Sequence, residues 1–122
     1  MEVVRYHRQW RWYSPKQGYP VSRREFDDLV DHGRAALISV MRRYEHNEHR
    51  HRHLTNLGNG LLELRTSVGN DEFRLLFFHD TPVHVIALLP FYKNTQKLPL
   101  KERRLAEQRM NEWIANGKKG SA

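Results

Sequence analysis

The sequence predicts an α+β fold, in which a small, mainly antiparallel sheet packs against helices. An apolar stripe at helical spacing lies early in the chain, three apolar strand-like segments separated by turn residues lie in the middle, and an amphipathic segment lies near the end. The predicted order is strand, helix, helix, strand, strand, strand, helix. With 122 residues in all, we expect a single domain over residues 1–116 and a disordered tail over residues 117–122.

The N-terminal third predicts one strand followed by helical structure. Residues 2–13 are rich in β-branched and aromatic side chains, and a stretch with two prolines and a glycine ends this strand. Ser22 can cap the next helix, with Glu25 as its capping-box partner. Apolar residues at helical spacing continue to Glu45 and are interrupted near Gly33, which leaves two helices or one kinked helix open.

The middle of the chain predicts three consecutive strands, at residues 61–66, 72–79 and 83–92. The motif Asn-Leu-Gly-Asn-Gly before the first of them is a turn signal. The third strand is apolar on both faces, which predicts a central, buried position. Pro99 opens the last helix and Gly117 is expected to end it.

Composition limits the possible functions. The chain has 21 Lys and Arg against 14 Asp and Glu, a formal net charge of +7, which favours a polyanionic partner such as nucleic acid, although a membrane surface or an acidic protein fits equally. There is no cysteine, so disulfides, thiolate zinc sites and cysteine nucleophiles are excluded. No signal peptide or membrane-spanning segment is recognisable, and we expect a cytoplasmic protein.

Two arginines are the first candidates for chemistry. Alternation along a strand places Glu63 and Arg65 on one side of the first middle strand, and Arg74 on one side of the second. Arginines on neighbouring strands can converge on one phosphate, which guanidinium groups bind in a bidentate manner. The alternative is a solvated strand arginine paired with Glu63 or Asp71.

The segment after the third strand is the second candidate. Site residues often lie where a strand ends in a loop, and four polar side chains follow here: Tyr92, Lys93, Thr95 and Lys97. A solvated basic loop is the alternative interpretation.

A histidine-rich segment lies between the helical region and the middle strands. Its four histidines, at positions 46, 49, 51 and 53, have spacings that could hold Zn²⁺ or Ni²⁺. Arg50 and Arg52 lie between them, however, and their charge opposes a bound cation. We therefore expect no metal site and no cofactor, and interpret the segment, Arg52 included, as a basic surface that touches phosphates. His79 and His84 flank a turn and are expected at the surface.

Together these motifs resemble the phage-derived, HigB-like branch of the RelE/ParE toxin superfamily. The resemblance spans residues 19–109 and rests on the order of several short motifs. These are Glu-Leu-Arg at Glu63–Arg65, Phe-Arg at Phe73-Arg74, Phe91, Lys-Asn-Thr-Gln-Lys at 93–97, Pro99, and a helix with Ala106 and Arg109. The sequence departs from the pattern at Asn94, where the family often has a second lysine, and in the histidine-rich segment, which has no counterpart that we can align.

The resemblance implies a RelE-like fold and an mRNA-cleaving toxin, without cofactor, from a toxin–antitoxin pair. Such toxins most often act in the ribosomal A site and assemble with a cognate antitoxin, here expected to be of helix-turn-helix type, into a hetero-oligomer. It places Arg65, Arg74, Lys93 and Tyr92 in catalysis, with Lys97, Thr95, Glu63 and Arg52 contacting RNA. The implied reaction is metal-independent attack by the ribose 2′-OH on the adjacent phosphorus.

Two other functions remain open from sequence. ParE-like members share the fold but act on DNA gyrase, and the Glu-Leu-Arg and Lys-Asn-Thr-Gln-Lys motifs favour the RNA-cleaving branch over them. The other is a non-catalytic RNA-binding phage accessory protein, which the asparagine at position 94 leaves open.

Overall fold

A five-stranded sheet in the order β1-β5-β4-β3-β2 forms the centre of the computed structural model, which describes residues 7–15, 18–93 and 99–120 (backbone only for 118–120). The strands are β1 (Gln9–Trp12), β2 (Leu54–Gly58), β3 (Leu61–Val68), β4 (Asp71–His79) and β5 (His84–Tyr92). β1 is parallel to β5, and all other neighbours are antiparallel. This confirms the predicted α+β class and adds one strand, β2, to the predicted order.

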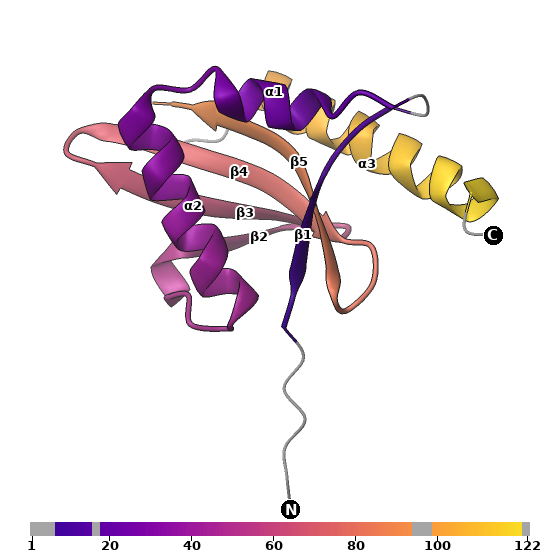
Figure 1. Ribbon diagram of the computed structural model, residues 1–122, viewed down its shortest axis with the longest axis horizontal. Coiled ribbons are helices and arrows are strands. Elements are labelled where there is room, and N and C mark those ends of the chain that lie inside the picture. Colours follow the sequence, from indigo (N-terminus) through magenta and orange to yellow (C-terminus); the bar gives the residue numbers. More distant parts are fainter. Residues whose placement is uncertain (1–6, 16–17, 94–98, 121–122) are drawn as a thin grey trace, which may run out of the picture.

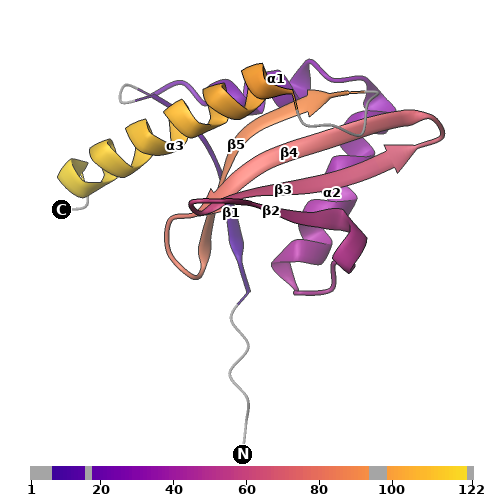
Figure 2. The ribbon, with the colours of Figure 1, turned by 180° about the vertical axis from the view of Figure 1, so that it is seen from behind.

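Helices cover both faces of the sheet. Helices α1 (Val21–Asp27) and α2 (Asp31–Glu45) lie on one face, and α3 (Leu100–Gly120) crosses the other (Figures 1 and 2). Apolar side chains between α2 and the sheet form one core cluster, with Leu37, Val40, Phe73 and Phe77 among its members. A second cluster lies beneath α3 and includes Leu61, Leu76, Phe78, Ala106 and Met110.

Two of the three inner strands, β4 and β5, are buried on both faces, as their continuous apolar sequences predict. β4 is the central strand of the five, while β5, predicted to be central, lies between β4 and β1. Leu76 of β4 pairs with Leu89 of β5, and the next residue, Phe77, pairs with Ala87, so Leu88 is an extra residue that forms a β-bulge. The bulge shifts the side-chain alternation of β5 by one residue. As a result Leu88 and Leu89 both pack in the cluster beneath α3.

Turn chemistry fixes the β2–β3 hairpin. Gly58, Asn59 and Gly60 have φ angles of +93°, +54° and +89°, a left-handed region that glycine and asparagine adopt with little strain. The predicted turn is therefore present. The strand before it was not predicted, because Leu54–Gly58 alternates weakly and follows a polar, histidine-rich segment.

The helical segment forms two helices rather than one kinked helix, and two of its predicted details are wrong. Helix α1 begins one residue before Ser22 and has no side-chain cap; the Ser22 hydroxyl is buried and donates to the Tyr13 carbonyl over 3.4 Å. Glu25 instead accepts two hydrogen bonds from Arg109 of α3, at 2.6 and 2.9 Å. Tertiary pairing between α1 and α3 thus replaces the local capping box.

Helix α3 continues past its predicted end, because Gly117 lies inside the helix and the last helical residue is Gly120. Glycine inside a helix costs only about 1 kcal/mol relative to alanine. In the parts of the chain that the structure describes, no helix is both long and apolar enough to cross a lipid bilayer.

Candidate active site

Arg65 and Arg74 lie directly opposite each other on the antiparallel strands β3 and β4. Residues an even number of positions apart on a strand point to the same face, so Arg65 shares a face with Leu61, and Arg74 shares a face with Leu76. Both leucines pack in the cluster beneath α3, which places both arginines on the face that α3 covers. The structure therefore brings the two predicted arginines together on one face.

Two glutamates complete a four-residue charge network, here called the arginine–glutamate network: Glu63, Arg65, Glu72 and Arg74. Glu72 Oε1 lies 2.9 Å from Arg65 Nε and 3.1 Å from Arg74 Nη2. Glu63 Oε1 lies 3.3 Å from Arg65 Nη2, and its Oε2 lies 3.7 Å from Arg74 Nη1. Each carboxylate thus contacts both guanidinium groups, and the formal charges of the four side chains sum to zero.

The two arginines differ in exposure. The Arg74 side chain is 0% exposed and that of Glu63 1% exposed, whereas the Arg65 side chain is 28% exposed. The Arg65 side chain is therefore partly exposed to solvent, while two carboxylates lie within ion-pair distance of its guanidinium nitrogens. Arg74 is enclosed and interacts with the same carboxylates from within the protein.

Glu72 is the residue of this network that the sequence interpretation missed. It lies two residues before Arg74 on the same strand, so alternation already places both on one face. The sequence interpretation considered Glu63 and Asp71 as arginine partners. The structure pairs the arginines with Glu63 and Glu72.

Tyr92 lies on the opposite face of the sheet. It is the register partner of Phe73, whose ring packs against α2, and the two ring centroids are 5.4 Å apart. The Tyr92 hydroxyl donates to Asp71 Oδ1 over 3.1 Å, and this hydrogen bond raises the pKa of Tyr92. A role in proton transfer near Arg65 depended on a lowered pKa, so neither position nor pKa favours it.

The remaining predicted site residues are less closely grouped. The Lys93 backbone N–H donates to the Glu72 carbonyl over 2.8 Å, which extends the β4–β5 pairing next to the arginine–glutamate network. Thr95 and Lys97 lie outside the described residues. Arg52 is exposed in the short helix η1 (His51–His53) and shares a hollow with Thr66, which faces α2 rather than α3.

The histidines do not form a metal site within the described ranges, where no group of three or more His, Asp or Glu side chains could hold a metal ion. His79, expected at the surface, is half-buried and lies 2.6 Å from the Tyr44 hydroxyl. Burial and, next, the charge of Arg8 lower the pKa of His79. Burial also lowers the pKa of His49, whose ring packs against Tyr44.

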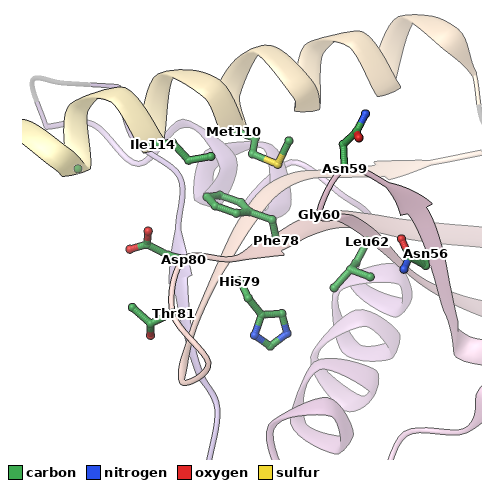
Figure 3. A pocket seen from close by; sticks show the side chains of 11 residues that line it. Asn56, Asn59, Gly60, Leu62, Phe78, His79, Asp80, Thr81, Met110 and Ile114 are labelled. Carbon is green, nitrogen blue, oxygen red and sulfur yellow. The ribbon is translucent and has the colours of Figure 1, made fainter.

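A hollow of about 770 Å³ lies between the second half of α3 and the strands. Figure 3 shows Met110 and Ile114 of α3 on one side and Phe78, Leu62 and His79 on the other. None of its described lining residues is an arginine or lysine, so these residues offer no permanent cation for a phosphate. The arginine–glutamate network, which does, remains the stronger candidate site.

Comparison with known proteins places this geometry in a family. Residues 24–111 match the family model described as "Phage derived protein Gp49-like (DUF891)". The chain belongs to the Gp49-like family. It is also similar to two proteins called "Probable endoribonuclease HigB1", from two strains of Mycobacterium tuberculosis (CDC 1551 / Oshkosh and ATCC 25618 / H37Rv). Each is 38% identical over 105 residues, which cover 85% of this chain and 83% of the relative.

These findings confirm the resemblance to the phage-derived, HigB-like branch. The Gp49-like match includes α2, the strands β2 to β5 and most of α3, and therefore all four residues of the arginine–glutamate network. β1 lies outside it.

Proposed function

We propose that this Gp49-like protein is the toxin of a type II toxin–antitoxin pair and acts in the cytoplasm as an endoribonuclease on mRNA. The similarity to proteins named as probable endoribonucleases supports the reaction class. The observation on which the proposal chiefly rests is the partly exposed side chain of Arg65, whose guanidinium lies against Glu63 and Glu72 on a sheet face of a strongly basic protein.

The proposed reaction uses a nucleophile from the substrate. The ribose 2′-oxygen attacks the adjacent phosphorus and the bond to the 5′-oxygen of the next nucleotide breaks, which gives a 2′,3′-cyclic phosphate and a 5′-OH. The 2′-OH proton leaves to a base and the departing oxygen gains a proton. Because the substrate supplies the nucleophile, the protein needs to position it in line and stabilise the negative charge on the phosphate.

Arg65 is the residue proposed to stabilise that charge. Guanidinium donors fixed before substrate binds cost little reorganisation during the reaction, and one such contact contributes about 3 kcal/mol, or about a hundredfold in rate. Glu63 lies 3.3 Å from Arg65 Nη2 and Glu72 lies 2.9 Å from its Nε, so the two carboxylates orient the guanidinium group. In the same scheme Arg74 is a positioning residue, because its enclosed guanidinium holds both carboxylates.

Lys93 is proposed to add positive charge beside this site, because its backbone is fixed against Glu72. Tyr92, Thr95 and Lys97 stay sequence predictions, the first with an unfavourable position and the other two in the segment 94–98. In the proposed scheme the ribosome positions the mRNA, so the protein itself does not need a strong acid–base pair.

The antitoxin is proposed to be a helix-turn-helix protein in a hetero-oligomer with the toxin. It needs an acidic surface to match the toxin's net charge of +7.

A second candidate, RNA binding without cleavage, is favoured by one observation. The charges of the arginine–glutamate network cancel within the protein, and Tyr92 lies on the other face. A site of this kind can bind a phosphate through Arg65 without moving a proton.

Expression without antitoxin in bacteria, with mapping of mRNA 5′ ends, separates the candidates. We expect growth arrest with new 5′ ends inside translated codons, lost in Arg65→Ala. Arg23→Ala is the matched control, because the exposed Arg23 side chain pairs with Asp27 on α1 and lies over the Trp12 ring, away from the arginine–glutamate network. Growth arrest with intact mRNA and DNA double-strand breaks would indicate a gyrase-directed toxin, and harmless expression with RNA binding would indicate the second candidate.

A further inference from the structure

A second group of arginines lies on the face of the molecule opposite Arg65. Arg42 and Arg43 belong to the last turn of α2, while Arg50 and Arg52 belong to the histidine-rich segment that follows. Figure 1 shows this segment beside the C-terminal half of α2. The fold thus places Arg42 and Arg43, which had no predicted role, beside the segment that the sequence analysis interpreted as a basic surface.

Three of these arginines line one hollow of about 290 Å³, here called the arginine hollow. Its other polar lining residues are Ser39, His53 and Thr66. A second hollow of about 330 Å³ adjoins it, because Ser39 and Arg43 line both, and it adds Arg42, His46 and Glu48. Cations therefore outnumber the single carboxylate along this surface.

Within the part of the chain that the structure describes, the guanidinium groups of the arginine hollow form no ion pair with a carboxylate. Among the described residues, no Asp or Glu oxygen lies within 4.0 Å of a side-chain nitrogen of Arg42, Arg43, Arg50 or Arg52. This differs from the arginine–glutamate network, where both guanidinium groups have carboxylate partners. Unpaired surface arginines in one concave place form a ready binding surface for an anion.

Backbone structure holds the arginine hollow in shape. The His53 N–H donates to the Arg50 carbonyl over 2.9 Å, and the Arg50 N–H donates to His53 Nδ1 over 3.4 Å. Nδ1 can accept only while the ring is neutral. Burial, followed by the charges of Arg52, Arg43 and Arg50, lowers the pKa of His53 and favours that neutral form. His53 therefore fixes the turn that presents Arg50 and Arg52.

We propose that the arginine hollow binds the phosphate backbone of RNA, as a contact separate from the site at Arg65. Its described lining is mainly polar, with Ala36 and Val40 as the apolar members, and includes no Phe, Tyr or Trp, whereas the centre of a protein–protein interface is typically apolar and rich in these three residues. Arginine, serine, threonine and histidine side chains are the groups that contact phosphate and sugar oxygens. Such contacts position the protein on RNA without reading its sequence.

The proposal explains the histidine-rich segment as a frame for phosphate contacts rather than a metal ligand set. It does not depend on cleavage, because the hollow faces α2 and lies across the sheet from Arg65. A backbone contact on this side would hold structured RNA, or a second stretch of a long RNA, while the other face meets the scissile phosphate.

The test uses a fluorescein-labelled, unstructured RNA with 2′-O-methyl riboses, which attack by a 2′-OH cannot cleave. Binding to the full chain is followed by fluorescence anisotropy over a range of NaCl concentrations. Removing one phosphate-binding charge makes the plot of log affinity against log salt shallower by about 0.7 for a single strand. For Arg43→Gln/Arg50→Gln/Arg52→Gln we expect a slope shallower by about 2 and affinity reduced about tenfold at low salt.

The matched control is Arg11→Gln/Arg23→Gln/Arg24→Gln, which removes the same charge from β1 and α1. Equal losses in both triple variants would show a bulk charge effect and overturn the proposal. If the Arg43, Arg50 and Arg52 variant binds RNA like wild type but loses its complex with the antitoxin, the surface docks a protein and the proposal is also wrong. The single variant Arg52→Gln changes one exposed side chain and tests the proposal even if the triple variant fails to fold. For it we expect a slope shallower by about 0.7.

Discussion

The arginine–glutamate network and the arginine hollow use the same side chain in opposite ways. In the network, Arg65 and Arg74 share two carboxylates on the face beneath α3, and Arg74 has no exposed surface. In the hollow, Arg43, Arg50 and Arg52 have no carboxylate within 4.0 Å among the described residues and face an open concavity. Pairing gives a guanidinium a defined orientation, whereas lack of pairing leaves its charge available to attract an anion.

The largest expected effect comes from breaking the network. Arg74→Leu leaves Glu63, 1% exposed, and Glu72, 11% exposed, with one fewer cation. Removing one partner from a buried charge network costs about 3–5 kcal/mol, because the remaining charges are desolvated and uncompensated. We expect urea unfolding to show a loss of that size. For Arg52→Leu in the hollow we expect a change within about 0.5 kcal/mol. Similar losses in both variants would abolish the distinction.

The next largest loss of stability is expected where α2, the helix that carries Arg43 of the arginine hollow, packs against the sheet. Helix α2 approaches β4 at Gly33, where an added Cβ would come within 2.7 Å of the Phe73 Cδ1 atom. The Phe73 ring is buried and has little room to move, so Gly33→Ala should cost about 1–3 kcal/mol. Gly117→Ala is the control: a Cβ there meets nothing within 4 Å, and we expect stabilisation of about 0.5–1 kcal/mol in a helix interior. Thermal unfolding of both variants tests this, and unchanged stability in Gly33→Ala would contradict the close packing.

These particular residues also show what sequence can predict. Alternation placed Glu63, Arg65 and Arg74 on strand faces, and the same rule, applied to Glu72, would have found the fourth member of the network. Strand alternation is a local property, so it survives folding. The capping box failed because Glu25 has a stronger, bidentate partner in Arg109, 84 positions along the chain. The arginine hollow combines α2, the histidine-rich segment and β3, and no local pattern brings those three together.

The side of the molecule that carries α2 should also be the one sensitive to mildly acidic pH. The pKa values of His79 and His49 are lowered, first by burial and next by the charge of Arg8. Because the pKa is lower in the folded state, the unfolded state binds a proton more readily than the folded state once the pH falls below the unfolded value of 6.5. The folded protein therefore loses stability as the pH falls from 6.5 towards the folded pKa. We expect a lower Tm at about pH 5.5 than at about pH 7.5. His79→Gln, which cannot titrate, should show a smaller difference. An equal drop in both proteins would exclude His79 as a cause.

The smallest effect expected is that of one arginine of the hollow. Arg52→Gln removes a single exposed charge and should make the salt dependence of RNA binding shallower by about 0.7. The paired Arg23→Gln on α1, with the same change in net charge, should leave the slope unchanged. Equal slopes for the two variants would show that position in the hollow has no influence.

In the proposed scheme the arginine–glutamate network acts in the chemical step and the arginine hollow acts in RNA binding. These two roles are tested most directly by single-turnover cleavage of mRNA on ribosomes, with the maximal rate and the apparent Kd determined separately. We expect Arg65→Ala to lower the maximal rate about a hundredfold with little change in Kd. The variant Arg43→Gln/Arg50→Gln/Arg52→Gln should weaken Kd and leave the maximal rate unchanged. A full maximal rate in Arg65→Ala, with only Kd altered, would contradict the assignment of Arg65 to the chemical step.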